Sequence, residues 1–218
     1  MYPKQIEMAE SVRDYRRTAV VGCNSSGKDY AAARILCWWQ ATRYPAKTVV
    51  IGPTHRQVSD VVWQEVRAAY RVASYRAKPG LGGDMYPRAS RWYDGPDHFS
   101  IGFATDDALR IQGFHSPNLL CILTEAHAIR QADIEAVKRL NPARILLTGN
   151  ALSDGGEFFQ AFHPSNQSDA DLYNTISISA FDTPNLLYEE DGIFIPGMIT
   201  AQDIEERKNE WGEESALF

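Results

Sequence analysis

One segment near the N-terminus restricts the possible folds more than any other part of the sequence. Residues 22–28 read G-C-N-S-S-G-K and fit the pattern G-x-x-x-x-G-K of a phosphate-binding loop. The apolar run 18–23 predicts a strand before it, and a helical pattern follows from about Lys28 to Thr42. A loop between a strand and a helix presents backbone N–H groups and a helix N-terminus to an anion. The segment therefore predicts an α/β protein that binds a nucleotide through its phosphates.

Each part of this loop has a physical role. Glycine permits positive φ angles and a close approach of phosphate oxygens, and Lys28 supplies a mobile charge to the terminal phosphates. The alternative is a glycine-rich turn before a helix, which the flanking strand and helix make less favourable. The residues expected to contact the nucleotide from this segment are Gly22, Cys23, Asn24, Ser25, Ser26, Gly27, Lys28, Asp29 and Tyr30.

Strand and helix patterns alternate along the rest of the chain. Further strands are predicted at 48–51, 99–104, 119–123, 144–147 and 175–179, and further helices at 57–70 and 133–140. The segment 77–97 is rich in Gly and Pro and predicts a loop or hairpin. The alternation predicts a three-layer αβα core with a mostly parallel central sheet. We expect this core to span 1–180 and a small C-terminal lid or linker to span 181–218.

Polar residues follow three of the predicted strands directly, and such strand ends meet at one edge of a parallel sheet. Glu125 is the candidate general base, placed to orient and deprotonate an attacking water; the alternative is a solvated acid at a helix start. Asn150, in Thr148-Gly149-Asn150, is a candidate sensor of the γ-phosphate, although Gly-Asn is also common in turns. Arg110 is a candidate to stabilise transition-state charge, donated to a neighbouring subunit, or else a solvated surface arginine.

The position after the loop lysine departs from the usual pattern. Asp29 stands where a Ser or Thr hydroxyl normally ligates Mg²⁺, and Thr124 stands where a strand-end Asp is expected before the catalytic Glu. Together they supply the same hydroxyl and carboxylate with their origins reversed, which we interpret as an exchanged pair of Mg²⁺ ligands. Two alternatives stay open: a decayed nucleotide site without turnover, and a metal held mostly by water.

Charge is distributed unevenly along the chain. The formal net charge of -6 argues against a wholly basic nucleic-acid binder, and the C-terminal segment is strongly acidic. Between 67 and 92, however, cations and aromatic residues are interleaved, which is typical of a surface that grips a phosphate backbone. A solvated helix face followed by a surface hairpin explains the pattern equally well. The candidate DNA contacts are Arg76, Lys78, Arg88 and Arg91.

Several classes of protein are disfavoured by what the sequence lacks. No apolar run is long enough to span a bilayer, so no membrane partner is expected. The three cysteines have no C-x-x-C spacing and the five histidines show no metal-ligand spacing, so no zinc site is predicted.

With these motifs in order, the chain resembles the ATPase domain of the large terminase subunit of tailed bacteriophages, a P-loop NTPase of the ASCE type. Tyr2-Pro3-Lys4-Gln5 resembles the segment in which a Gln recognises adenine, so Gln5 is expected to contact the base. Residues 22–29 and 119–125 are similar to the two phosphate and metal motifs, and Thr148-Gly149-Asn150 is similar to the motif that couples hydrolysis to movement. Further similar phrases occur at 113–115, 179–185 and 197–215.

The resemblance implies an ATP- and Mg²⁺-dependent motor that pumps double-stranded DNA into a procapsid. It further implies a homo-oligomeric ring, monomeric when isolated, docked on a portal protein and regulated by a small terminase subunit, in the host cytoplasm. The family's nuclease domain has a cluster of acidic residues, and because the sequence shows no such cluster we expect no DNA cleavage by this chain. Two other functions remain possible: a helicase-like ATPase, and a non-hydrolysing nucleotide-binding assembly scaffold.

Overall fold

A single mixed sheet forms the centre of the computed structural model, which describes residues 1–76, 80–105, 111–165 and 172–212. The strand order is β3-β4-β5-β2-β6-β7-β1-β8. Neighbours from β5 to β8 pair in parallel, whereas β3 and β4 extend one edge as an antiparallel hairpin. The strands are β1 (Arg17–Gly22), β2 (Lys47–Gly52), β3 (Asp84–Met85), β4 (Arg91–Tyr93), β5 (Phe99–Ala104), β6 (Leu119–Leu123), β7 (Arg144–Gly149) and β8 (Asn174–Ile178).

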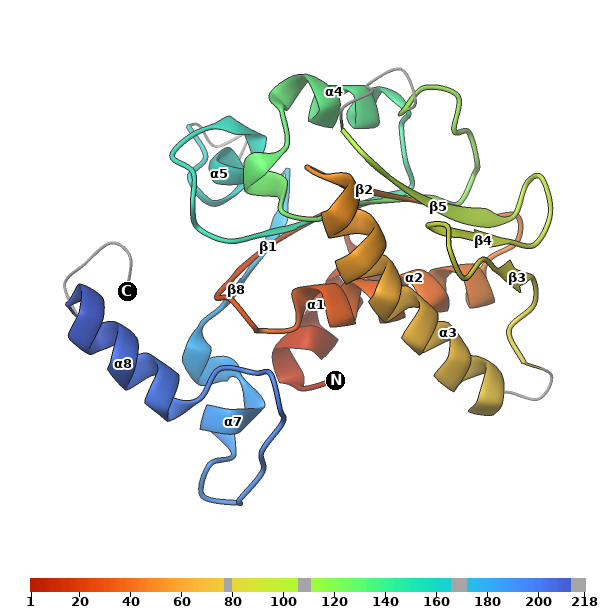
Figure 1. Ribbon diagram of the computed structural model, residues 1–218. Coiled ribbons are helices and arrows are strands. Elements are labelled where there is room, and N and C mark those ends of the chain that lie inside the picture. Colours follow the sequence, from red (N-terminus) through yellow and green to blue (C-terminus); the bar gives the residue numbers. More distant parts are fainter. Residues whose placement is uncertain (77–79, 106–110, 166–171, 213–218) are drawn as a thin grey trace.

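Helices cover both faces of this sheet (Figure 1). One face carries α1 (Pro3–Asp14), α2 (Lys28–Thr42) and α3 (Trp63–Arg76), and the other carries α4 (Gln131–Arg139) and α5 (Gly156–Phe162). Strand β6 is buried throughout, because Leu120 and Ile122 pack towards the first face while Leu119, Cys121 and Leu123 pack towards the second. The predicted three-layer core with a mostly parallel sheet is confirmed.

Several segments differ from the sequence prediction, which includes neither α5 nor any helix after residue 180. The expected helix at 57–70 begins as a π-helix, η1 (Gln57–Val62), and continues as α3 to Arg76. Helix α1 is absent from the predicted elements, since two of its four buried side chains, Gln5 and Ser11, are polar and interrupt the apolar pattern.

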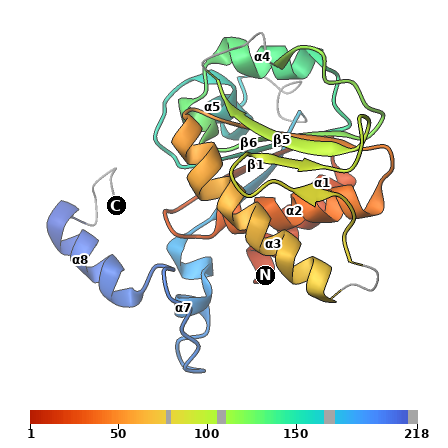
Figure 2. The ribbon, with the colours of Figure 1, turned by 45° about the vertical axis from the view of Figure 1, so that its right-hand side comes forward.

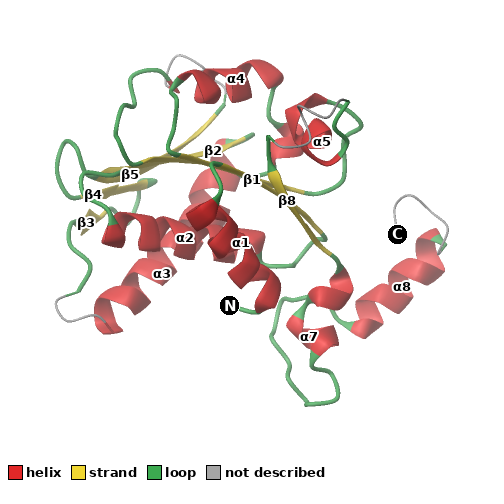
Figure 3. Ribbon diagram, turned by 180° about the vertical axis from the view of Figure 1, so that it is seen from behind, coloured by secondary structure: helices red, strands yellow, loops and turns green. Residues whose placement is uncertain are grey.

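The C-terminal segment lies beside the β8 edge, outside the three layers (Figure 2 and Figure 3). It contains a 3₁₀ turn, η4 (Ala180–Asp182), and the helices α7 (Pro184–Leu187) and α8 (Ala201–Trp211). The Asn185 side chain donates to the carbonyls of Ile195 and Met198 and accepts from the Ile195 N–H, which fixes the loop before α8. The boundary predicted near residue 180 stays a prediction.

The three cysteines occupy different environments. Cys37 in α2 and Cys121 in β6 are buried, whereas Cys23 is half-buried in the loop after β1. Among the described residues, no helix is both long and apolar enough to cross a membrane.

Candidate nucleotide-binding site

The loop between β1 and α2 has the backbone shape of an anion cradle. Ser25 and Gly27 have φ angles of 59° and 72°, and α2 begins at the next residue, Lys28. The Ser26 hydroxyl donates to the Cys23 carbonyl at 2.8 Å and closes the turn. A Cβ on Gly27 would lie 2.6 Å from the Gln5 amide nitrogen, so both the φ angle and the packing require glycine there.

Helix α1 supports this loop through hydrogen bonds to its backbone. The Tyr2 hydroxyl donates to the Ser26 carbonyl at 2.7 Å, and Gln5 Nε2 donates to the Gly27 carbonyl at 3.1 Å. Gln5 is only 3% exposed, so its side chain is already part of the loop's packing. Its expected contact with adenine stays a prediction.

Lys28 is folded back onto the loop that carries it. Its Nζ donates to the carbonyls of Gly22 and Cys23 at 3.0 and 2.9 Å, and to Asn150 Oδ1 at 2.7 Å. Burial lowers the pKa of Lys28, against the opposing charges of Glu125 and other nearby acidic groups. The ammonium therefore lies among polar acceptors that a phosphate would replace.

The side chains of Asp29 and Thr124 are in contact, and their role as Mg²⁺ ligands stays a prediction. The Thr124 hydroxyl donates to Asp29 Oδ1 at 2.9 Å, although the two residues are 95 positions apart. Thr124 is 1% exposed, and burial raises the pKa of Asp29 in spite of that hydrogen bond. The end of β6 thus places a hydroxyl against the carboxylate at the start of α2.

Glu125 follows β6 directly and has an unusual backbone. Its φ and ψ of 50° and 46° lie in the left-handed region, which is rare for a side chain of this size. Its Oε2 lies 3.5 Å from His127 Nδ1, an atom that also accepts a hydrogen bond from the Asn150 N–H at 3.3 Å. Backbone strain of this kind is commonly found at functional sites.

Asn150 connects the three strand ends. It accepts from Lys28, its Nδ2 donates to Asn24 Oδ1 at 2.7 Å, and its own N–H donates to His127. Thr148 and Gly149 are buried at the end of β7 and bring Asn150 to the loop. The structure therefore brings together the predicted residues from the ends of β1, β6 and β7.

The remaining predicted residues lie elsewhere. Tyr30 is partly exposed under the Arg34 guanidinium, 3.0 Å from its ring centroid. Arg76 and Arg88 are exposed, and Arg91 lies over the Tyr93 ring at 4.7 Å, all at the β3–β4 side of the sheet. Arg110 and Lys78 lie outside the described residues. The DNA-contact assignment stays a prediction.

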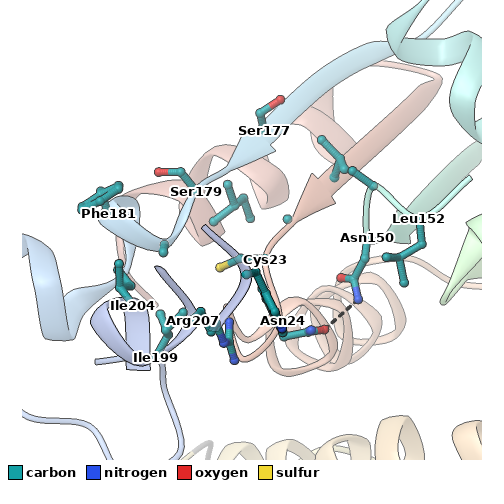
Figure 4. A pocket seen from close by; sticks show the side chains of 16 residues that line it. Cys23, Asn24, Asn150, Leu152, Ser177, Ser179, Phe181, Ile199, Ile204 and Arg207 are labelled. Carbon is teal, nitrogen blue, oxygen red and sulfur yellow. Dashed lines mark hydrogen bonds between the residues drawn. The ribbon is translucent and has the colours of Figure 1, made fainter. Parts of the chain in front are cut away.

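A cavity of about 520 Å³, which was not among the predicted features, adjoins the loop (Figure 4). Its walls come from the start of the loop, the segment after β7 that includes Asn150, the end of β8 with η4, and helix α8. The residues from α8 that line it are Ile204, Arg207 and Trp211. A signal was present in the sequence, because these residues recur on one helical face of an otherwise acidic segment.

Strand order and site together define a class of protein. Strand β7 lies between β1, which carries the phosphate loop, and β6, which carries Glu125. The chain has a P-loop NTPase fold of the ASCE type. More particularly, it has the fold of the ATPase domain of bacteriophage large terminases.

Comparison with solved structures supports this assignment. The Thermus phage P74-26 large terminase ATPase domain superimposes with a TM-score of 0.63 at 17% identity, covering 95% of this chain and 91% of that one. The large terminase of another thermophilic bacteriophage gives a TM-score of 0.66 at 14% identity, and its complex with ADP gives 0.60 at 14%. Each covers 95% of this chain, which spans 49% of that second terminase. No protein-family model matches the sequence, and no curated protein matches it significantly.

Proposed function

We propose that this chain is the ATP-hydrolysing domain of a viral DNA-packaging motor. The observation that carries the proposal is the convergence of Lys28, the Asp29–Thr124 pair and Glu125 at the loop between β1 and α2. The second of the similar terminases has been solved with ADP and with ATP-γ-S, which supports a nucleotide as the ligand of the shared fold. Translocation of double-stranded DNA into a procapsid at its portal is the motion that such hydrolysis would drive.

The loop and its lysine bind the substrate in this proposal. Backbone N–H groups between Ser25 and Lys28 surround the β-phosphate, and Lys28 exchanges its contact with Asn150 for the terminal phosphates. Glu125 orients the attacking water and accepts its proton. Asn150 then responds to loss of the γ-phosphate, because its side chain accepts a hydrogen bond from Lys28 and its backbone N–H donates one to His127.

Asp29 and Thr124 fit Mg²⁺. Adjacent oxygens around an octahedral Mg²⁺ with bonds of 2.0–2.1 Å are about 2.9 Å apart. Thr124 Oγ1 and Asp29 Oδ1 are separated by 2.9 Å, so both oxygens can ligate one ion without moving apart. Mg²⁺ commonly binds through one or two protein oxygens together with water and substrate phosphates. When bound, it neutralises charge on the transferred phosphoryl group.

Partners follow from the proposed role. A ring of such domains, a portal protein and a small terminase subunit would complete the motor, and a trans-acting arginine such as Arg110 would accelerate hydrolysis. DNA would be gripped by the Arg76, Arg88 and Arg91 side of the sheet.

The test compares Mg²⁺-dependent ATP hydrolysis at high protein concentration in the natural chain and in Glu125→Gln. We expect slow turnover that falls by about 10²–10⁴-fold in the variant, because the general base is lost. Glu135→Gln, an exposed change on α4, is the matched control and should retain turnover. Equal turnover in the natural chain and Glu125→Gln would overturn the assignment. No turnover in either would favour the non-hydrolysing scaffold.

A further inference from the structure

The cavity beside the phosphate loop has a distinctive wall chemistry. Apolar side chains from β8, η4 and α8 form much of its surface, and Asn24, Asn150, Ser177 and Ser179 add neutral polar groups. Arg207 is the single charged residue among the described residues that line it. A site of this kind attracts an anion or the anionic part of a larger ligand.

Helix α8 directs that arginine towards the loop although the helix is acidic. Glu205, Glu206 and Glu210 are exposed, whereas Ile204 and Arg207 are half-buried at the cavity. Positions 204, 207 and 211 share one face of a helix, so a single orientation of α8 presents them together. Figure 4 shows Arg207 beside Cys23 and Asn24 of the loop.

The start of α8 is held in place by specific contacts. Thr200 and Asp203 form a capping box, in which Asp203 Oδ2 accepts from the Thr200 N–H and hydroxyl at 2.8 and 2.7 Å. Ile199, just before the helix, is 4% exposed. The residue before α8 is therefore anchored at the cavity wall, and the capping box defines where the helix begins.

Arg207 is weakly engaged in this position. It lies 5.9 Å from the Trp211 ring centroid and makes no ion pair with a carboxylate in the described part of the chain. The carboxylate one turn earlier, Asp203, is occupied by its capping contacts. The guanidinium keeps donors for a ligand in the cavity.

The cavity runs along the loop from the β8 side to the end of β7, where Asn150 also lines it. Asn150 accepts a hydrogen bond of 2.7 Å from Lys28, and Glu125 follows β6, the next strand beyond β7. A polyphosphate held by Lys28, with its terminal phosphate towards Glu125, therefore borders this cavity.

We propose that Arg207 binds the phosphate chain of the nucleotide from the α8 side, opposite the loop amides. This inference rests on the proposed nucleotide-binding function of the loop. It assigns a contact from the C-terminal segment to the same substrate, so a guanidinium and the loop would hold the polyphosphate between them.

The test measures dissociation constants of ADP, ATP-γ-S and tripolyphosphate for the natural chain, Arg207→Gln, Arg207→Lys and Lys208→Gln by calorimetry. Arg207→Gln should weaken all three ligands about tenfold, because a charge-assisted hydrogen bond is lost. Arg207→Lys should bind with intermediate affinity, because lysine keeps the positive charge but lacks the paired N–H donors of the guanidinium. Lys208→Gln removes the same charge from the same helix, at a position that does not line the cavity, and should bind as the natural chain does.

Each result supports or overturns the contact. Nucleotide binding by Arg207→Gln equal to that of the natural chain would overturn the Arg207 contact while leaving the nucleotide site intact. Weaker binding of both nucleotides with unchanged binding of tripolyphosphate would overturn the phosphate assignment and place the contact at the base or ribose. An equal loss of affinity in Lys208→Gln would mean that the effect comes from the net charge of the helix and not from a contact made by Arg207. A natural chain that binds neither nucleotide would overturn the proposed function as well. Thermal unfolding of every variant verifies the fold, which these changes should not disturb because α8 contains no buried residue.

Discussion

Lys28 Nζ and Asn150 Oδ1 are joined by a hydrogen bond of 2.7 Å that connects the phosphate loop to the end of β7. The lysine that would hold the terminal phosphates is thus bound to the residue that would report their loss. Phosphate and Asn150 compete for the same ammonium, which provides a direct physical link between occupancy of the loop and the position of the β7 end.

Removal of this competitor should separate binding from turnover. We expect Asn150→Ala to bind ADP a few-fold more tightly, because one hydrogen bond of about 1 kcal/mol no longer has to be broken. ATP hydrolysis should fall, since the proposed γ-phosphate contact is lost. Calorimetry and steady-state turnover measure the two effects, with the exposed Asn209→Ala as control. Weaker ADP binding would show that Asn150 organises the loop rather than competing for Lys28.

The Asp29–Thr124 pair predicts a non-additive double mutant. Asp29→Ser should lower Mg²⁺-dependent turnover about 10–100-fold by removing the carboxylate of the pair. Thr124→Asp alone should also be harmful, because it would bury a second carboxylate against Asp29. The double variant restores one hydroxyl and one carboxylate and should recover part of the activity. A double-mutant cycle in turnover and in Mg²⁺ affinity with ADP present measures the coupling; simple addition of the two losses would refute the exchange.

The left-handed backbone of Glu125 predicts that two inactive variants will differ in stability. Both Glu125→Gly and Glu125→Ala should lose hydrolysis. Only glycine relieves the positive φ of 50°, so Glu125→Gly should be about 1 kcal/mol more stable than Glu125→Ala, or about 2–4 °C in thermal midpoint. Thermal unfolding of the two variants provides the comparison, and equal midpoints would mean that the backbone there carries no strain.

Glu157 predicts a pH-dependent contribution to folding stability. Burial alone would raise the pKa of Glu157, but hydrogen bonds from Lys138, Gln131 and Tyr173 lower it overall. A lowered folded-state pKa gives stability that is present above the ordinary glutamate pKa and is lost as pH falls through the folded value. Glu157→Gln should therefore destabilise the chain by about 1–3 kcal/mol at pH 7.

The difference between Glu157→Gln and the natural chain should disappear in acid. Denaturant unfolding between pH 3 and 7 measures it, and the exposed Glu190→Gln serves as the control. A difference that stays constant down to pH 3 would mean that Glu157 contributes through packing and not through its charge.

Gln5 provides a test of base recognition. If its amide reads adenine, Gln5→Ala should reduce the preference for ATP over GTP by roughly tenfold. Tyr2→Phe removes a hydrogen bond to the same loop without altering any base contact, so it should weaken both nucleotides equally. An equal loss of affinity for both nucleotides in Gln5→Ala would mean that Gln5 supports the loop and does not recognise the base.

The centre of the site was predictable because its main residues belong to short, local sequence motifs. The loop, its strand and its helix are adjacent in sequence, and the complementary departures at Asp29 and Thr124 predicted a contact across 95 positions. Strand β6 was recognisable as a continuous apolar run covered on both faces.

Other parts of the site depend on tertiary contacts that no sequence period records. Gln5 is polar yet buried, because its partner is a backbone carbonyl of the loop. The helical face of Ile204, Arg207 and Trp211 can be recognised in the sequence, but its placement against the loop depends on contacts such as those of Asn185, which have no sequence signature. Outside the site, the loop or hairpin expected at 77–97 contains β3 and β4, whose strands are too short to show an alternating pattern.

The distribution of the three thiols gives the chain a built-in chemical reporter. Burial raises the pKa of Cys37 and of Cys121 to about 12, so neither is readily alkylated in the folded state. Burial also raises the pKa of Cys23, but the Lys28 charge opposes it, and this thiol lines the cavity at the start of the phosphate loop. The rate at which iodoacetamide modifies the unaltered chain is therefore a footprint of that loop, readable by mass spectrometry without an engineered label.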